Sequence, residues 1–227
     1  MNQTGATLLG LFAKYWEPGH VKTRLAATIG DERAAQLHRA FLETLLRRFD
    51  GAAARRVLVF SPADRVEAFR DLADQTWDVQ PQSAGDLGRR MQAFFETAFA
   101  GGAEKAVLLG SDSPTLPRHV MQEAFRRLDQ APVVLGPTAD GGYYLIGAAG
   151  SAPPVFEGVA WSTPAVWPDT LERLAAAGLS HQVLPRWYDV DEADDLTRLR
   201  EELADADDRD LKGLRVRIEE IIGELEF

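Results

Sequence analysis

Residues 106–117, AVLLGSDSPTLP, decide the fold of this 227-residue chain. Residues 106–109 are apolar on both faces and end at Gly110, which predicts a buried central strand of a parallel sheet. Asp112 follows that strand directly, where ligands bind in open α/β sheets. A carboxylate at this point suits Mg²⁺, which binds through one or two carboxylates plus substrate phosphates. Asp112 is therefore our first candidate metal ligand, with Asp112 and Ser113 capping the next helix as the alternative.

Strand-like and helix-like stretches alternate on both sides of this strand. We expect strands at residues 7–13, 56–60, 77–79, 106–109, 133–135, 143–146 and 182–184. We expect helices at residues 31–49, 86–100, 117–128, 163–177, from 194 onward, and at 211–225. A long loop should follow the first strand, Ser61 should cap a helix, and Pro168 should break or kink another. The pattern predicts a three-layer α/β/α fold with a mostly parallel, mixed sheet.

Composition and charge narrow the classes of protein that fit. The chain has no cysteine, so a disulfide framework, a thiol nucleophile and a zinc-thiolate site are excluded. Its 25 basic and 35 acidic residues give a net charge of −10, which disfavours nucleic acid and anionic membranes as partners. No apolar run approaches the length of a membrane span, and a cytoplasmic protein is expected. We expect one domain over residues 1–227, in which the acidic stretch 201–210 precedes a C-terminal helical extension at 205–227.

A basic segment follows the first strand. Lys14, Lys22 and Arg24 surround Gly19 in the sequence KYWEPGHVKTRL. A glycine-containing loop with several cations can hold a polyphosphate through backbone amides, ammonium groups and a guanidinium. The alternative is a solvated basic loop.

Two further segments lie where strands should end. The first consists of Asp140, Gly141, Gly142 and Tyr143. Its paired glycines would let an acceptor approach the backbone closely. The alternative is a plain hairpin turn, which Asp-Gly also indicates. Asp189 and Asp191 stand just before a helix, where one of them would supply a second metal carboxylate or cap that helix. We choose Asp191, because it is nearest the helix.

Taken together, these segments resemble a known family. F-A-K-x₄-G-x-V-K-T-R-L, G-S-D-S-P-x-L, G-P-x-x-D-G-G-Y-Y-L-I-G, W-S-T-P and D-V-D-x-x-D-D-L occur in that order over residues 12–196. They are similar to bacterial glycosyltransferase-like proteins of the nucleotide-diphospho-sugar transferase (GT-A) superfamily, related to the phospholactate guanylyltransferases. The chain departs from that pattern at Trp16, where the family usually has proline, and it lacks the G-x-G-x-R loop of sugar nucleotidyltransferases and the D-x-D of many glycosyltransferases.

The resemblance implies a GT-A, Rossmann-like sheet, nucleotide binding in the N-terminal half and a divalent metal, Mg²⁺ or Mn²⁺. It implies that Lys14, Lys22 and Arg24 bind phosphates and that Asp112 and Asp191 hold the metal. The segment G-D-L-G-R-R-M at 85–91 would lie near the base or ribose. Asp86, Gly88 and Arg89 are therefore further candidates for nucleotide binding. The alternative for this segment is an ordinary helix start.

The leading hypothesis is a Mg²⁺-dependent nucleotidyltransferase that joins a nucleotidyl group from an NTP to a small phosphorylated or hydroxylated acceptor. Lys22, Arg24 and Asp112 would be its catalytic residues, acting by alignment and charge neutralisation. The alternatives are a glycosyltransferase that uses a nucleotide-diphospho-sugar and a nucleotide-binding accessory protein without turnover. The sequence leaves the base, the acceptor and the oligomeric state open.

Overall fold

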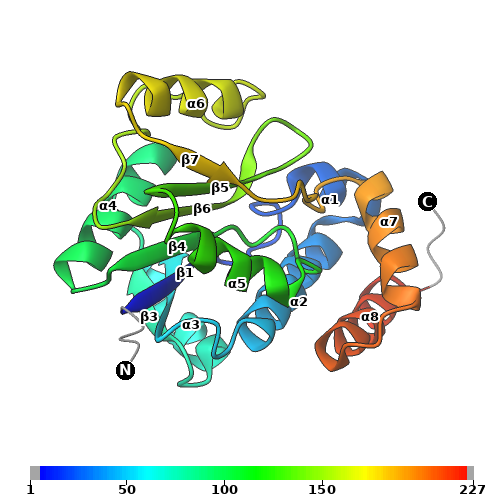
Figure 1. Cartoon of the computed structure of the whole chain (residues 1–227). Helices are drawn as coiled ribbons and strands as arrows, with labels where there is room; N and C mark the ends of the chain where they lie inside the picture. Colours follow the sequence, from blue (N-terminus) through cyan, green and yellow to red (C-terminus); the bar gives the residue numbers. More distant parts are fainter. Residues whose placement is uncertain (1–5, 224–227) are drawn as a thin grey trace.

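The computed structural model describes residues 6–223 and is built on one seven-stranded sheet of order β3-β2-β1-β4-β6-β5-β7 (Figure 1). The strands are β1 (Thr7–Lys14), β2 (Arg55–Ser61), β3 (Asp78–Pro81), β4 (Lys105–Leu109), β5 (Val133–Pro137), β6 (Tyr143–Ala149) and β7 (His181–Val183). Within residues 6–223, β6 is the one strand of the sheet that runs antiparallel to its neighbours. The apolar β4 is the central strand, as predicted, and lies parallel to β1 and antiparallel to β6. The mostly parallel, mixed α/β sheet is confirmed.

Helices cover both faces of the sheet. They are α1 (Thr23–Ile29), α2 (Asp31–Arg48), α3 (Val66–Ala73), α4 (Leu87–Ala100), α5 (Arg118–Arg127), α6 (Val166–Ala176), α7 (Ala193–Ala204) and α8 (Arg209–Ile222). Residues of α2, α3 and α5 pack on one face, and residues of α4 and α6 pack on the other. Successive side chains of β1 point to opposite faces of the sheet. Leu9 and Leu11 pack with the apolar residues of α2, α3 and α5, while Leu8 and Phe12 pack with those of α4 and α6.

The C-terminal helices α7 and α8 stand beside α2 at one side of the molecule (Figure 1). They form a third apolar cluster with α1 and α2, in which Leu199 and Ile218 are almost fully buried. Beneath the start of α8, the guanidinium of Arg48 is only 3% exposed and lies 3.0 Å from the Asp208 carboxylate. Helices α7 and α8 therefore pack on the body of the protein through apolar contacts and through the ion pair between the buried Arg48 guanidinium and Asp208.

Several local expectations were wrong. The long loop after β1 contains the short helix α1, whose Leu25 and Ile29 are buried against α2 and the C-terminal helices. Ser61 does not cap a helix, because it is the last residue of β2 and is paired with Lys14 of β1. A 3₁₀ turn, η1 (Ala63–Arg65), precedes α3 instead. Pro168 does not break α6, since it lies in the first turn, where no helical hydrogen bond is lost.

The boundaries of the last helices also differ from expectation. Glu201 and Glu202 belong to α7, so the acidic stretch is not a separate spacer. The final helix begins at Arg209 and reaches Ile222, and the expected end at Leu225 lies outside the described residues. Asp208 sets the new start, because its side chain accepts hydrogen bonds from the amides of Asp210 and Leu211.

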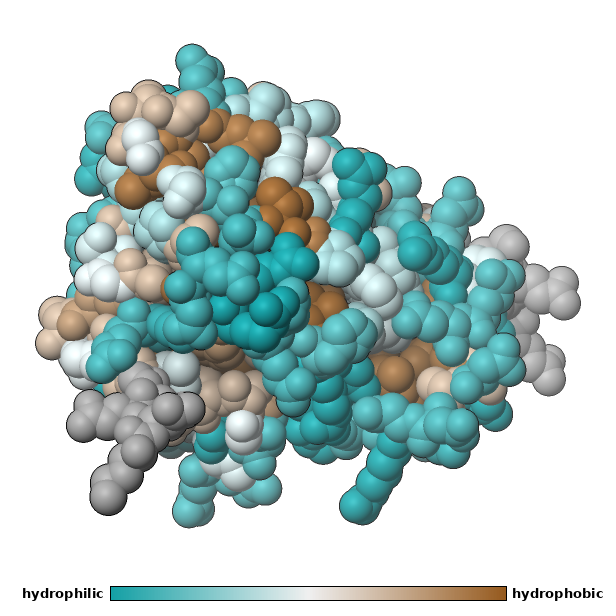
Figure 2. All heavy atoms as spheres, viewed as in Figure 1, coloured by the Kyte–Doolittle hydropathy of each residue, from teal (hydrophilic) through white to brown (hydrophobic). Residues whose placement is uncertain are grey.

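Hydrophilic side chains cover most of the face shown in Figure 2, with smaller hydrophobic areas between them. None of the helices within residues 6–223 combines the length and the hydropathy that crossing a bilayer requires.

The docking of α8 can be tested with two substitutions on that one helix. Ile218→Ala should lower the free energy of unfolding by about 2–5 kcal/mol, because it empties a site in the apolar cluster where Ile218 is 1% exposed. Val216→Ala is the control, because Val216 is 53% exposed and should change stability by less than about 0.5 kcal/mol. Equal effects in urea unfolding would show that α8 does not pack as described.

Candidate functional site

A cavity of about 830 Å³ lies beyond the carboxyl ends of β1 and β4. The strand order reverses between these two strands, which is where ligands bind in open α/β sheets. The end of β1, residues 110–112, the start of β6, the first turn of α4 and residues 161–164 line it. Its volume falls within the roughly 300–1,000 Å³ that is usual for small-molecule sites.

Three carboxylates meet at one end of this cavity. Asp112 follows β4, and Asp189 and Asp191 precede α7. The amide of Val190 donates to the carbonyl of Asp112 at 2.9 Å, and the Ser113 hydroxyl donates to Asp189 Oδ1 at 2.6 Å. These bonds fix the chain before α7 against the end of β4, so residues far apart in sequence share one site.

The alternative capping roles of these aspartates are not what the structure shows. Pro117 stands at the N-cap of α5 without a side-chain hydrogen bond, so neither Asp112 nor Ser113 caps that helix. Glu192 is the N-cap of α7 and forms a capping box with Asp195. Asp112 and Asp191 are therefore left to face the cavity and the cations beside it.

Lys22 is buried between two of the carboxylates. Its side chain is 2% exposed, its ammonium contacts the Asp112 carboxylate, and its Nζ donates to Asp191 Oδ1 at 2.9 Å. The Lys22 backbone is left-handed, with φ 49° and ψ 41°, at the N-cap of α1. A non-glycine residue in this region is strained and persists where surrounding contacts hold it. The ion pairs supply that restraint.

Arg24 completes the charged cluster. Its Nη2 donates to Asp191 Oδ2 at 2.6 Å, and its Nη1 donates to Glu192 Oε1 at 2.8 Å. Two of the three cations that we expected to bind phosphates thus pair with the carboxylates that we expected to hold a metal. The sequence did not indicate this pairing.

Burial and charge set the protonation states in this cluster. Burial alone would lower the pKa of Lys22, but Asp112 and Asp191 outweigh it and raise that pKa above its usual value. Burial would raise the pKa of Asp112, yet Lys22, followed by His38, holds it below the usual range. Burial, with the charge of Asp112 next, raises the pKa of Asp189 to about 7. Lys22 and Asp112 are therefore both charged near pH 7, while Asp189 is partly protonated.

Lys14 also lines the cavity, but it has a different partner. Its Nζ donates to the carbonyl of His20 at 2.6 Å, which bends the basic loop back toward β1. Gly19 lies in this loop with φ 76°, a value that favours glycine, and is not among the lining residues. Beneath the loop, His38 is buried, and its Nε2 lies 3.0 Å from the Lys14 carbonyl oxygen.

The turn at residues 140–143 joins β5 to β6 and borders the cavity through Asp140, Gly142 and Tyr143. The Asp140 side chain accepts from Thr138 Oγ1 and from the amide of Gly142. Gly141 has φ +93°, and a Cβ there would lie 2.6 Å from the Pro164 carbonyl oxygen. The close approach at Gly141 is therefore to the protein's own backbone.

The segment at residues 85–91 meets the cavity through Leu87, Arg90 and Met91. Asp86 is the N-cap of α4 and accepts from the amide of Arg89 at 2.8 Å, and Arg89 is exposed. A Cβ on Gly88 would lie 2.5 Å from Nε1 of Trp161. These contacts are structural, and direct nucleotide binding by Asp86, Gly88 and Arg89 remains a prediction.

Other lining residues did not emerge as candidates from the sequence. Phe12, Gln82, Trp161 and Ser162 line the cavity from β1, the end of β3 and the loop before α6. The rule that ligands lie beyond strand ends would have found Gln82, which follows β3 directly. The W-S-T-P motif contains Trp161 and Ser162, but its place against α4 depends on the tertiary fold.

The fold is similar to that of a putative nucleotide-diphospho-sugar transferase. The crystal structure of a putative nucleotide-diphospho-sugar transferase from Desulfovibrio desulfuricans G20 is 33% identical, with a TM-score of 0.85 over 95% of this chain and 97% of that chain. Residues 44–163 match the family described as "Uncharacterized protein conserved in bacteria (DUF2064)", and the chain belongs to that family. No curated protein matches the chain.

More distant structures share the fold. CMP:2-keto-3-deoxy-manno-octonic acid synthetase complexed with CTP is 12% identical, with a TM-score of 0.54 over 88% of this chain and 98% of that one. A cytidylyltransferase from Leptospira borgpetersenii serovar Hardjo-bovis is 13% identical, with a TM-score of 0.56 over 98% and 99%. The expected superfamily is confirmed at the level of fold, and the relation to phospholactate guanylyltransferases remains a prediction.

The raised pKa of Asp189 gives a pH dependence of stability. Because the folded pKa of about 7 exceeds the usual 3.8, this group favours folding below pH 4, and that contribution is lost as the pH rises through 7. Asp189→Asn should therefore be more stable than the wild type at pH 8, by up to about 4 kcal/mol, and should have no such advantage at pH 4. Urea unfolding at both pH values measures the difference. An advantage of equal size at both would contradict the assignment.

Proposed function

We propose that this protein is a divalent-cation-dependent nucleotidyltransferase. An acceptor phosphate or hydroxyl would attack the α-phosphorus of an NTP and form a new P–O bond. The bond from that phosphorus to the α,β-bridging oxygen would break, pyrophosphate would leave, and a hydroxyl acceptor would release its proton to water. The observation that carries the proposal is the meeting of Asp112, Asp191, Lys22 and Arg24 at the carboxyl ends of β1 and β4. Phosphoryl chemistry relies on such positioning and charge neutralisation.

The family and the shared fold support this class of reaction. The D. desulfuricans relative is named as a putative nucleotide-diphospho-sugar transferase. One fold neighbour is named a cytidylyltransferase, and another is a CMP:2-keto-3-deoxy-manno-octonic acid synthetase complexed with CTP. Each of the three names refers to a nucleotide or a nucleotidyl group. Fold alone does not assign chemistry, so the proposal rests on the charged site.

The residues present fit a hard divalent cation such as Mg²⁺ or Mn²⁺. Asp112 and Asp191 offer two carboxylates, the number that Mg²⁺ commonly uses together with substrate phosphates. Residues 6–223 contain no group of three or more histidine, aspartate or glutamate side chains arranged to hold a metal by themselves. The cation would thus be held jointly by Asp112, Asp191 and the nucleotide, and when bound it would neutralise the phosphate charge.

The remaining chemistry falls to the chain itself. Lys22, Arg24 and Lys14 would bind the triphosphate, and Lys22 would have to exchange at least one carboxylate for a phosphate oxygen. Gly19 would shape the phosphate loop, while Asp86, Gly88 and Arg89 would lie toward the base or ribose. The turn with Asp140, Gly141, Gly142 and Tyr143 would position the acceptor. An acceptor phosphate needs no protein base, because it is already an anion near pH 7.

Glycosyl transfer is the second candidate, favoured by the name of the D. desulfuricans relative. The same cluster would then stabilise the leaving nucleoside diphosphate. The two reactions differ in donor, and the three cations exceed what a diphosphate needs, which favours an NTP.

Ligand-induced stabilisation separates these possibilities. A ligand at about 100 times its Kd should add roughly 2.7 kcal/mol, which corresponds to a rise of about 5–10 °C in Tm for a chain of this length. We expect the largest Mg²⁺-dependent rise with an NTP in thermal melting against panels of NTPs and nucleotide-diphospho-sugars. A preference for nucleotide-diphospho-sugars would favour glycosyl transfer. The absence of a Mg²⁺-dependent rise in Tm with either panel would contradict both enzymatic functions. Nucleotide binding without turnover of any acceptor would indicate an accessory protein.

A second test uses the ammonium between the two aspartates. Lys22→Met should raise the affinity for Mn²⁺ alone by at least about tenfold, because a cation no longer competes for Asp112 and Asp191. Lys14→Met is the control and should leave Mn²⁺ affinity unchanged, since Lys14 bonds to a carbonyl. Calorimetry on folded protein, checked by circular dichroism, gives the comparison. Unchanged or weaker Mn²⁺ binding by Lys22→Met would rule out these aspartates as the cation site.

A further inference from the structure

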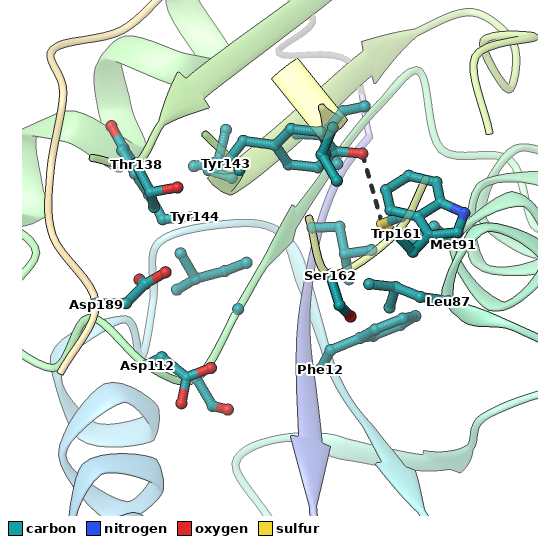
Figure 3. Close-up of a pocket in the computed structure, with 18 of the residues that line it drawn as sticks. Phe12, Leu87, Met91, Asp112, Thr138, Tyr143, Tyr144, Trp161, Ser162 and Asp189 are labelled. Atoms are coloured by element: carbon teal, nitrogen blue, oxygen red, sulfur yellow. Dashed lines mark hydrogen bonds between the residues drawn. The ribbon is translucent and has the colours of Figure 1, made fainter. Parts of the chain in front are cut away.

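Two segments of the chain run side by side at the charged end of the cavity. The first is residues 112–115, which follow β4, and the second is residues 188–191, which precede α7. A backbone hydrogen bond joins the segments at the carbonyl of Asp112, and the Ser113 hydroxyl donates to Asp189. Figure 3 shows Asp112 and Asp189 close together on these two segments. Their relative position therefore decides how the carboxylates of the site are spaced.

A third set of bonds joins the far ends of these segments. Thr115 is 2% exposed and Tyr188 is 4% exposed, and their hydroxyl oxygens lie 3.3 Å apart. Both hydroxyls donate to the same oxygen, Oε2 of Glu202, and the bond from Thr115 measures 3.2 Å. Glu202 belongs to α7, so one carboxylate of this helix bonds to both segments. We call Thr115, Tyr188 and Glu202 the Glu202 cluster.

Burial and charge favour this bonding pattern. Burial, followed by the hydrogen bond to Glu202, raises the pKa of the Tyr188 hydroxyl, so Tyr188 stays protonated and acts as a donor. The guanidinium carbon of Arg198 lies over the Tyr188 ring, 3.8 Å from its centroid. Hydrogen bonds to a carboxylate are stronger than those between neutral groups. The Glu202 cluster is therefore a firm connection between α7 and the two segments.

Glu202 differs from its acidic neighbours in the stretch 201–210. Glu201, Asp205 and Asp207 are exposed, whereas Glu202 is partly buried and accepts from two hydroxyls. Removing a carboxylate from water is costly unless it is hydrogen-bonded, so the two hydroxyls are what hold Glu202 in this position. A residue of the acidic stretch thus takes part in the structure around the site.

The Glu202 cluster acts on the site through the backbone. Its three members are not among the residues that line the cavity. Thr115 lies three positions after Asp112, and Tyr188 lies three positions before Asp191. A cation site needs its ligands held to within about 0.5 Å, which requires support from residues behind them.

We propose that the members of the Glu202 cluster are positioning residues for the cation site. They hold the two segments in register, and this register sets the separation of Asp112 and Asp191 without any contact between the cluster and the ligand. The inference rests on the proposed function for the identity of that ligand, a divalent cation. The Lys22 ammonium lies between the same two carboxylates, so its surroundings depend on the same register whether or not a cation binds.

Mn²⁺ binding to the full chain tests this inference by calorimetry, alone and with the α,β-methylene analogues of ATP, GTP, CTP and UTP. Tyr188→Phe and Thr115→Val each remove one hydroxyl and keep the shape of the side chain. Each should weaken Mn²⁺ binding by at least about fivefold, because the carboxylates lose their fixed spacing. Thr115→Ser keeps the hydroxyl and should bind Mn²⁺ as the wild type does.

Thr44→Val is the matched control, because Thr44 is 1% exposed and its hydroxyl donates to the Ala40 carbonyl within α2. It removes a buried hydroxyl away from the cavity and should leave Mn²⁺ affinity unchanged. All variants are compared at a temperature at which thermal melting shows them folded. A general loss of stability would therefore not be mistaken for a change at the site.

A second measurement needs no cation. The ¹H–¹⁵N NMR signal of the Lys22 ammonium, assigned by its absence in Lys22→Met, reports the position of the carboxylates around it. Tyr188→Phe and Thr115→Val should shift this signal, whereas Thr115→Ser and Thr44→Val should leave it in place.

Unchanged Mn²⁺ affinity and an unchanged Lys22 signal in Tyr188→Phe and Thr115→Val would overturn the inference. An equal loss of Mn²⁺ affinity in Thr44→Val would also overturn it, and so would weaker Mn²⁺ binding with an unmoved Lys22 signal, because the loss would then not act through the two aspartates. If the wild type binds no Mn²⁺ while both variants shift the Lys22 signal, the cluster positions the aspartates as inferred and the cation-dependent function fails.

Discussion

The buried ammonium of Lys22, held between Asp112 and Asp191, is the interaction on which the rest of the site depends. It joins the loop after β1, the end of β4 and the chain before α7. The Lys22 side chain is 2% exposed, whereas those of Asp112 and Asp191 are 40% and 30% exposed, so loss of the carboxylates would leave a buried ammonium without a counter-charge. A bound ligand could replace either partner of this ion pair. A divalent cation would take the place of the ammonium at the carboxylates, and a phosphate would take the place of the carboxylates at the ammonium.

The C-terminal helices contribute to this arrangement because α7 positions Asp191, one of its two carboxylates. Glu192 and Asp195 cap α7, which fixes the position of Asp191 directly before the helix. The apolar cluster of α1, α2, α7 and α8 packs beneath Lys22 and Arg24, so the charged residues stand on a rigid base. Helices α7 and α8 thus contribute to the geometry of the site as well as to stability.

The sequence predicted the sheet because strand-like and helix-like stretches alternate along it. It predicted the position of Asp112 because a short apolar run followed by Gly110 indicates a buried strand, and Asp112 lies just beyond its end. It missed α1, whose seven residues carry no capping signal and are held by tertiary contacts. It also missed the pairing of Lys22 with Asp191, which are 169 positions apart. Leu87 and Trp161 share a wall for the same kind of reason, since their proximity depends on how α4 packs on the loop before α6.

The proposed reaction requires Asp112 and Asp191 to hold a divalent cation together with nucleotide phosphates. A crystal structure with Mn²⁺ and a non-reacting NTP analogue, with Mn²⁺ located by anomalous scattering, tests it most directly. We expect the anomalous peak within coordination distance of both carboxylates, about 2.0–2.3 Å, and the Lys22 ammonium on a phosphate oxygen. A peak elsewhere, with Lys22 still paired to both aspartates, would contradict the account.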